Sequence, residues 1–148
     1  MRHALGGFLL VAFATCAAAQ DDAGKKLAKE LEGKYELVGM EVGGAKIDPK
    51  MFVERDYEVK DGKLIAIVAK KPDPINFTLD PSKKPGWIDF EEVKPNEKNQ
   101  KSYGIYKIEN GLWTICMSDQ DDPAKRPKEF KTVEGTTSII MVFKKADK

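Results

Sequence analysis

The sequence predicts an all-β protein, an eight-stranded antiparallel up-and-down barrel with a short N-terminal helix, and three observations predict it. After Gly33 the chain reads as short apolar or alternating stretches separated by turns. Two of these turns, Asp61-Gly62 and Asn110-Gly111, are typical of two-residue hairpins, because Gly accepts the positive φ that such turns need. No helix of crossover length separates the stretches, which argues against a parallel α/β sheet. Closing the strands into a barrel removes exposed edges, and a two-sheet sandwich is the alternative.

The expected helix covers Asp21 to Glu32. Leu27 and Leu31 lie four residues apart on one face among Lys and Glu, and Gly33 ends the helical pattern. The segment from Ile47 to Met51 contains Pro49 and is expected to be an irregular connection.

The eight expected strands have β-branched and aromatic residues and end at turn residues or prolines. They cover residues 35–42, 52–60, 63–70, 75–79, 87–93, 102–108, 112–118 and 138–145. Asp119 to Thr136 is the longest segment without a pattern, and we expect it and the N-terminal helix to cover part of the outside of the barrel through Phe130, Leu27 and Leu31.

Residues 1–19 are typical of a secretion signal. A positive start is followed by an apolar run from Leu5 to Ala14, which is too short to span a bilayer. Ala17-Ala18-Ala19 offers the small residues that a signal peptidase reads, so we expect a cut before Gln20 and a single domain at 20–148, secreted or periplasmic. The alternative is a lipoprotein anchored through Cys16.

The expected cut would remove His3, the only histidine, and Cys16, one of two cysteines. Nucleophilic catalysis usually relies on histidine as the base. The remaining thiol, Cys116, lies in an apolar strand, where we expect it to be inert and, without a second cysteine, free of an internal disulfide. The sequence therefore predicts a protein that is not an enzyme and has no cofactor.

Metal and carboxylate chemistry find little support. Asp119, Asp121 and Asp122 offer oxygen ligands, but an EF-hand counted from Asp119 has Ala124 where Gly is needed and Phe130 where Glu is needed. Asp89 and Glu91 share one face of a strand, which is typical of a solvated face. We expect no metal site and no catalytic pair, and an enzyme using carboxylates or tyrosines is the weakest hypothesis.

The charges are mixed along the chain. Without Arg2, 24 basic residues face 24 acidic ones, so no broad basic surface is expected to attract nucleic acid or anionic lipid. No later stretch has the roughly 20 apolar residues of a membrane helix, so no transmembrane span is expected.

Several motifs resemble known families. Gly33-Lys34-Tyr35 resembles the Gly-x-Trp opening of lipocalins, which pair that aromatic with an Arg near the last strand, where this chain has Lys144 and Lys145. The chain also resembles a family of small secreted lipocalin-like domains of unknown function, abundant in planctomycete bacteria. The resemblance covers about Leu27 to Lys145 and implies a fold and an export route, but no activity. It rests on Asp80-Pro81-Ser82-Lys83-Lys84-Pro85, Ile88-Asp89-Phe90, Gly104-Ile105-Tyr106, Leu112, Cys116, Arg126-Pro127, Phe130 and Val142-Phe143-Lys144.

The aromatic residues are the main candidates for ligand binding. In a barrel alternate residues point inward, so Tyr106 and Trp113 belong to sets of which one faces the lumen, and the lumen is either filled or holds one small ligand. In the long segment, Phe130 would plug the barrel mouth while Arg126 meets an anionic group, or both would anchor the segment. The candidate ligand-binding residues are Tyr106, Trp113, Trp87, Phe90, Arg126 and Phe130.

Two functions follow from these residues. The first is an exported, non-catalytic domain that binds a small apolar or amphipathic ligand in the barrel. The alternative is a structural or protein-interaction module of the cell envelope with a filled barrel. The sequence does not identify a protein partner.

Overall fold

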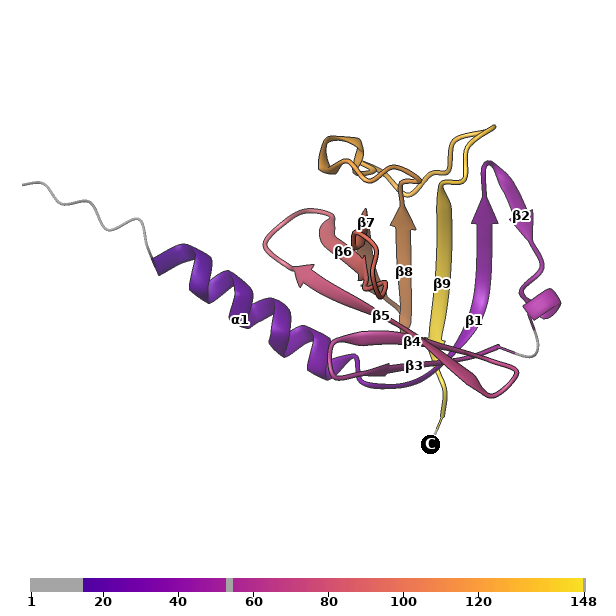
Figure 1. Cartoon of the computed structure of the whole chain (residues 1–148), viewed down its shortest axis with the longest axis horizontal. Coiled ribbons are helices and arrows are strands. Elements are labelled where there is room, and N and C mark those ends of the chain that lie inside the picture. The colour runs from indigo at the N-terminus through magenta and orange to yellow at the C-terminus, as the bar shows by residue number, and fades with distance from the viewer. Residues whose placement is uncertain (1–14, 53–54, 148) are drawn as a thin grey trace, which may run out of the picture.

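The computed structural model describes residues 15–52 and 55–147, and over these residues the protein is one helix followed by a closed sheet (Figure 1). The elements are α1 (Thr15–Glu30), β1 (Gly33–Val42), β2 (Ala45–Ile47), η1 (Pro49–Phe52), β3 (Arg55–Lys60), β4 (Lys63–Val68), β5 (Lys71–Asp80), β6 (Gly86–Glu92), β7 (Gln100–Glu109), β8 (Leu112–Met117), η2 (Pro123–Lys125) and β9 (Ile139–Lys145).

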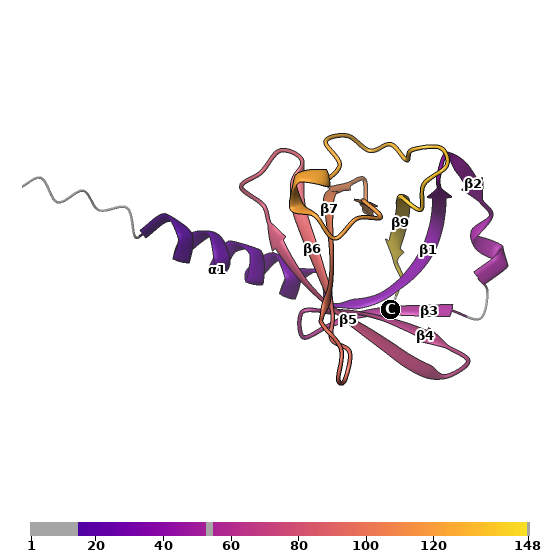
Figure 2. The ribbon, with the colours of Figure 1, turned by 45° about the horizontal axis from the view of Figure 1, so that its top comes forward.

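The strands form the expected barrel. From β3 to β9 each strand pairs antiparallel with the next, and β1 pairs with β3 on one side and with β9 on the other. The closed barrel therefore consists of β1 and β3–β9, which confirms the predicted fold (Figure 2). A register shift between Leu37 and Gly39 interrupts the β1–β9 ladder, as a β-bulge does where a strand bends.

Both predicted hairpin turns are present. Asp61 and Gly62 have φ angles of 50° and 70°, and Asn110 and Gly111 have φ angles of 53° and 75°. Two successive positive φ angles define the turn whose twist matches that of the flanking strands.

Two parts of the sheet differ from the sequence prediction. The chain after Gly43-Gly44 forms the short strand β2, which pairs with the end of β1 and was not predicted. The strand predicted at 75–79 begins at Lys71 and includes Pro72 and Pro74. This part of β5 pairs with β4 alone, because the pairing with β6 begins at Asn76. A proline is tolerated where its missing N–H would face an unpaired edge.

The helix α1 begins at Thr15, before the predicted Asp21, so it includes the last residues of the predicted signal; residues 1–14 of that signal lie outside the described residues. It packs on β5, and a side chain at Gly24 would collide with the carbonyl oxygen of Leu79. Leu31 is buried in the barrel core, and Leu27 and Ala28 pack against it. Leu31 thus contributes to the core, whereas the sequence analysis expected Leu27 and Leu31 to cover the outside of the barrel.

The opening Gly-x-aromatic motif joins the helix to the last strand. The Tyr35 hydroxyl donates to the Leu31 carbonyl oxygen at 2.6 Å. The Lys145 Nζ lies 5.9 Å from the centroid of the Tyr35 ring and donates to the Glu30 carbonyl oxygen at 3.3 Å. Gly33 has a φ of 142°, and a Cβ there would lie 2.7 Å from Lys145 Cε. A lysine therefore packs across this aromatic residue.

The long segment between β8 and β9, residues 118–138, lies across the strand ends and against the outer side of the barrel (Figure 1). Cys116 points outward but is 0% exposed, because its Sγ lies 3.7 Å from the carbonyl oxygens of both Glu129 and Lys131. Burial raises the pKa of this thiol. The segment is therefore a cover for outward apolar residues.

Candidate functional site

The structure separates the six candidate residues into two groups on opposite sides of the barrel wall. Opposite residues of an antiparallel pair share a face. Tyr106 pairs with Ile115, Trp113 with Phe143, and these residues face the lumen together with Phe90. The remaining three candidates, Trp87, Arg126 and Phe130, lie outside the lumen.

Aromatic rings fill the lumen around Trp113. Its ring centroid lies 5.8 Å from those of Tyr35 and Phe143 and 5.9 Å from that of Phe77. Trp113 is 1% exposed and Phe143 is 0% exposed. Burying one such side chain fully contributes about 1.5–3 kcal/mol to stability. These rings therefore form the core of the fold.

Tyr106 occupies the lumen side of β7 opposite a glycine. A Cβ at Gly86 would lie 2.5 Å from the Tyr106 ring, so the glycine leaves the space that the ring takes. Burial, and the negative charge of Asp80, raise the pKa of the Tyr106 hydroxyl.

The outward face of β5, β6 and β7 carries a different set of side chains. In the register of β5 and β6, Asp80 pairs with Trp87, Thr78 with Asp89, and Asn76 with Glu91. In the register of β6 and β7, Asp89 pairs with Tyr103 and Glu91 with Lys101. We call this surface the outer wall. It consists of Asn76, Thr78, Asp80, Trp87, Asp89, Glu91, Lys101 and Tyr103.

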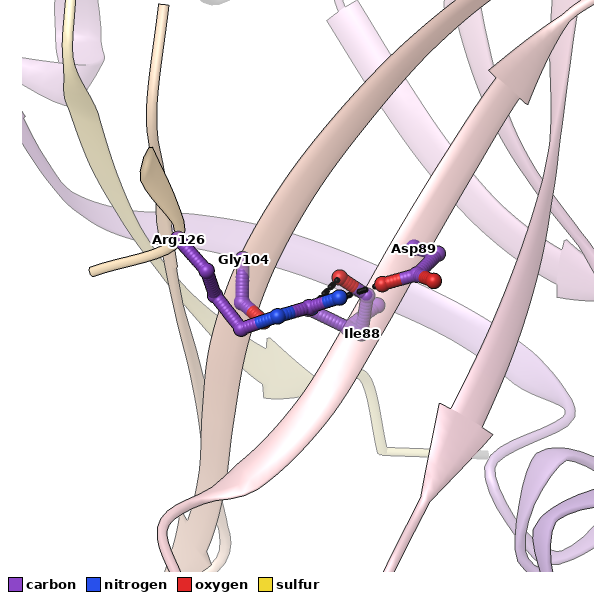
Figure 3. A network of polar contacts seen from close by, with 4 residues as sticks. All are labelled: Ile88, Asp89, Gly104 and Arg126. Atoms are coloured by element: carbon purple, nitrogen blue, oxygen red, sulfur yellow. Dashed lines mark hydrogen bonds and ion pairs between the residues drawn. The ribbon is translucent and has the colours of Figure 1, made fainter. Parts of the chain in front are cut away.

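Arg126 fastens the 118–138 segment to the outer wall (Figure 3). Its Nη1 donates to the carbonyl oxygens of Gly104 at 2.7 Å and Ile88 at 3.2 Å, and forms an ion pair with Asp89 Oδ1 at 2.6 Å. The Arg126 side chain is 9% exposed, whereas the Asp89 side chain is 42% exposed. The guanidinium thus bridges two neighbouring strands, and its contacts are those of an anchor.

The short helix η2 positions this arginine. Asp122 caps η2 by accepting a hydrogen bond from the Ala124 backbone N–H at 2.8 Å, and Pro123 begins the helix. Arg126 follows as the C-cap residue. Asp122-Pro123 is a signal for the start of a helical turn in the sequence. The sequence does not show that the next turn brings Arg126 onto β6 and β7, because that depends on where these strands lie.

The same guanidinium holds two aromatic rings of the outer wall. Arg126 Cζ lies 4.3 Å from the Trp87 ring centroid and 5.3 Å from that of Tyr103. Lys83 Nζ lies 4.8 Å from the Trp87 ring. Trp87 is nevertheless 40% exposed. An arginine over a tryptophan ring is a favourable cation–π contact, so the position of Trp87 is fixed while part of its surface stays accessible.

Two grooves adjoin each other on the outer wall and share Thr78 and Asp89. The first has a volume of about 290 Å³ and extends from Trp87 to Asp21 of α1. The second has a volume of about 250 Å³ and extends along Glu91 and Tyr103. Together they follow β6 across the outward face of the barrel.

Two other hollows are lined mainly by residues outside the outer wall. One of about 360 Å³ lies beside the contact of α1 with β5, near the Asp61-Gly62 turn, and adjoins the first groove at Asp21 and Thr78. One of about 350 Å³ lies within the 118–138 segment. Phe130 of that segment lies on the outer side of β7, with Lys107 Nζ 5.0 Å from its ring centroid. The structure thus places Phe130 on the outer side of the barrel, beside β7, and not at a mouth of the lumen as the plug hypothesis expected.

Two carboxylates of the outer wall lie where the sequence predicts them. Asp89 and Glu91 point outward as predicted, and Glu91 Oε1 accepts a hydrogen bond from Asn99 Nδ2 at 3.1 Å. Within residues 15–52 and 55–147, no three His, Cys, Asp or Glu side chains are grouped to hold a metal ion. In the same part of the chain no helix has the length and apolar character to cross a membrane.

Comparison of the chain with family models, with curated proteins and with solved structures finds no match. The arrangement of the side chains therefore carries the functional argument.

Among the eight residues of the outer wall, the sequence candidates for ligand binding include only Trp87. Tyr103 was not among the candidates, and Asp89 was assigned only to a solvated face. The alternation of Trp87, Asp89 and Glu91 with buried Ile88 and Phe90 was a signal for an outward row. What the pattern could not supply is the neighbouring strand that brings Tyr103 beside that row.

Proposed function

We propose that the protein is an exported, non-catalytic binding domain in which the filled barrel is a scaffold and the outer wall contacts the ligand or partner. The observation that carries this proposal is the contrast between the two tryptophans. Trp113 is enclosed by other rings in the lumen, whereas Trp87 is 40% exposed beside two grooves.

The composition of the outer wall supports recognition. Trp, Tyr and Arg are the residues that contribute most often to binding energy in interfaces. Here Trp87, Tyr103 and Arg126 lie together and are held in place by stacking and by backbone hydrogen bonds. Such preorganisation reduces the entropy lost when a ligand binds.

The proposed export rests on the signal-like residues 1–19 and on the expected cut before Gln20. The non-catalytic role rests on the side chains that would remain. The mature chain would have no histidine, and its one thiol is buried beneath the 118–138 segment, where burial raises its pKa. A protonated, covered thiol is a poor nucleophile.

A second candidate is binding of a small apolar ligand in the lumen, and two observations favour it. Trp113 Nε1 is buried without a hydrogen-bond partner among the described residues. Leu37, Met117 and Met141 pack against the core but are only partly buried. Methionine side chains adapt to irregular apolar ligands.

An apolar probe separates the two candidates. In a Trp87→Phe variant Trp113 is the single tryptophan, so its emission reports on the lumen alone. We expect titration with N-phenyl-1-naphthylamine to give no saturable quenching of Trp113, because rings already fill the space around it. Saturable quenching with a matching rise in probe fluorescence would overturn the outer-wall proposal in favour of the lumen.

A further inference from the structure

We propose that the outer wall binds a neutral oligosaccharide, with Trp87 as the stacking platform and the polar side chains of β5–β7 as partners for sugar hydroxyls. This inference rests on the proposed binding function and names its ligand class. It is carried by the aromatic ring, the pattern of donors and acceptors, the charge balance and the shape of the grooves.

The Trp87 ring supplies the apolar contact. One face of a pyranose ring presents mainly C–H bonds, which pack on a flat aromatic surface through dispersion and the release of water. Arg126 fixes the Trp87 ring at 4.3 Å from its guanidinium carbon, and the first groove lies beside the ring. A sugar needs such a rigid, exposed ring.

The remaining side chains of the wall match the hydroxyl groups of a sugar. A sugar hydroxyl is both a donor and an acceptor, so it is best met by a mixture of the two. Thr78 and Asn76 offer both functions, the carboxylates accept hydrogen bonds, and Lys101 donates them. These donors and acceptors lie on the neighbouring strands β5, β6 and β7, along the two grooves that share Thr78 and Asp89.

The charges of the wall balance, which favours a neutral ligand. Asp89 pairs with Arg126, and Asp21 at the edge of the first groove pairs with Lys25 at 2.5 Å. The negative charges of the other two carboxylates, Asp80 and Glu91, are offset by two positive charges on the same surface. Lys83 lies beside Trp87, and Lys101 lines the second groove with Glu91. A polyanion or a strongly basic peptide would gain little from this balanced surface.

The grooves favour a chain of sugars over a single one. Trp87 and Glu91 lie four residues apart on β6, which places them about 13 Å from each other. The two grooves join along this distance through Thr78 and Asp89. A short oligosaccharide can follow the strand while a single ring stacks at Trp87.

Lys83 gives the inference a specific consequence. Its ammonium lies 4.8 Å from the Trp87 ring centroid, where it competes with a stacking ligand. An exposed cation–π contact contributes about 0.5–1 kcal/mol, so removing the competitor should raise the ligand affinity about two- to fivefold.

The test is calorimetric titration of the purified protein with cellohexaose, laminarihexaose and mannohexaose. We expect at least one of them to bind, and Trp87→Ala to weaken that binding by about tenfold or more. Trp87→Phe keeps a ring and should stay within a few-fold of the wild type, and Lys83→Ala should bind more tightly. Met51→Ala, which trims a side chain of η1 that is 75% exposed and lies outside the outer wall, is the control and should change nothing.

Salt dependence distinguishes the ligand class. A neutral sugar should bind equally between about 50 mM and about 500 mM salt, because no ion pair is screened. Thermal unfolding of each variant shows that it is folded. The inference is overturned if no hexasaccharide binds the wild type, if Trp87→Ala binds as well as the wild type, or if heparin binds instead in a salt-sensitive manner. If no sugar binds and N-phenyl-1-naphthylamine also leaves Trp113 unquenched, the oligosaccharide is rejected as the ligand. The proposed function of the outer wall is then not contradicted, because the lumen has also bound nothing.

Discussion

Trp113 in the lumen and Trp87 on the outer wall are the same residue type on strands of the same barrel, yet their surroundings are opposite. Trp113 is 1% exposed and is surrounded by Tyr35, Phe77 and Phe143. Trp87 is 40% exposed and is held by the guanidinium of Arg126. Closure of the barrel, which fixes the inward face of each strand, decides which aromatic residue packs in the core and which stays exposed on the surface.

The largest expected effect is the loss of a ring from the lumen. Phe143→Ala removes a side chain that is 0% exposed and lies 5.1 Å from Tyr57 and 5.8 Å from Trp113, between ring centroids. We expect the free energy of unfolding in urea to fall by about 3–5 kcal/mol, because the substitution loses burial and leaves a cavity. The exposed-site control Met51→Ala, at a side chain of η1 that is 75% exposed, should lose less than about 1 kcal/mol. Equal losses for the two variants would show that the lumen is not the core.

The next effect concerns the anchor. Arg126→Ala removes the donor to the carbonyl oxygens of Gly104 and Ile88 and the partner of Asp89, and we expect stability to fall by about 1–3 kcal/mol. Hydrogen exchange should accelerate in the 118–138 segment, and Cys116 beneath it should become reactive toward a thiol reagent. Arg126→Lys should restore only part of this protection, since an ammonium lacks the planar fork of a guanidinium. Unchanged protection in Arg126→Ala would show that other contacts hold the segment.

The covered thiol gives a pH dependence. Burial raises the pKa of Cys116 in the folded protein, so the unfolded state loses this proton at a lower pH than the folded state. The contribution of the neutral thiol to stability is complete below the unfolded pKa near about 8.5 and is lost as the pH rises through the raised folded value. Urea unfolding at stepped pH should show this decline in the wild type and a smaller one in Cys116→Ala. Tyr35 and Tyr106, whose pKa values burial also raises, would add a decline at higher pH in both proteins. Identical pH profiles would contradict a role for Cys116.

The smallest expected effect on stability is that of the wall tryptophan. Trp87→Ala loses its cation–π contacts with Arg126 and Lys83, which should lower the free energy of unfolding by less than about 2 kcal/mol. Thermal or urea unfolding would check it. A loss as large as that of Phe143→Ala would mean that Trp87 belongs to the structural core, and the contrast between the two surfaces would disappear.

The sequence predicted the barrel because its signals are local. The residue pairs Asp61-Gly62 and Asn110-Gly111 themselves favour the positive φ angles of their turns, without help from distant residues. The β-branched residues between the turns indicate strands. The predicted strand bounds were wrong where they depend on which strands pair. The strand β5 includes Pro72 and Pro74, because β6 does not pair with this part of β5 and no N–H is needed there.

The candidate site was harder to predict for the same reason. Alternation assigned Tyr106 and Trp113 to sets, but which set faces the lumen depends on the closure of β1 on β9. Apolar outward residues obscured the pattern further, since Ile105 and Cys116 are buried beneath the 118–138 segment. The contacts of Arg126 join residues 22 and 38 positions apart, which no local pattern contains.

The central claim is that the lumen is filled and closed while the outer wall is accessible, and the indole N–H groups of the two tryptophans test it most directly. Hydrogen exchange of both groups can be followed by NMR in the wild-type protein, with Trp87→Phe assigning the signals. The account predicts that the Trp87 indole exchanges at the rate of an exposed group, while the Trp113 indole exchanges only on global unfolding. A Trp113 indole that exchanges as fast as that of Trp87 would contradict the account, because it would show that water, and therefore a ligand, reaches the lumen of the folded barrel.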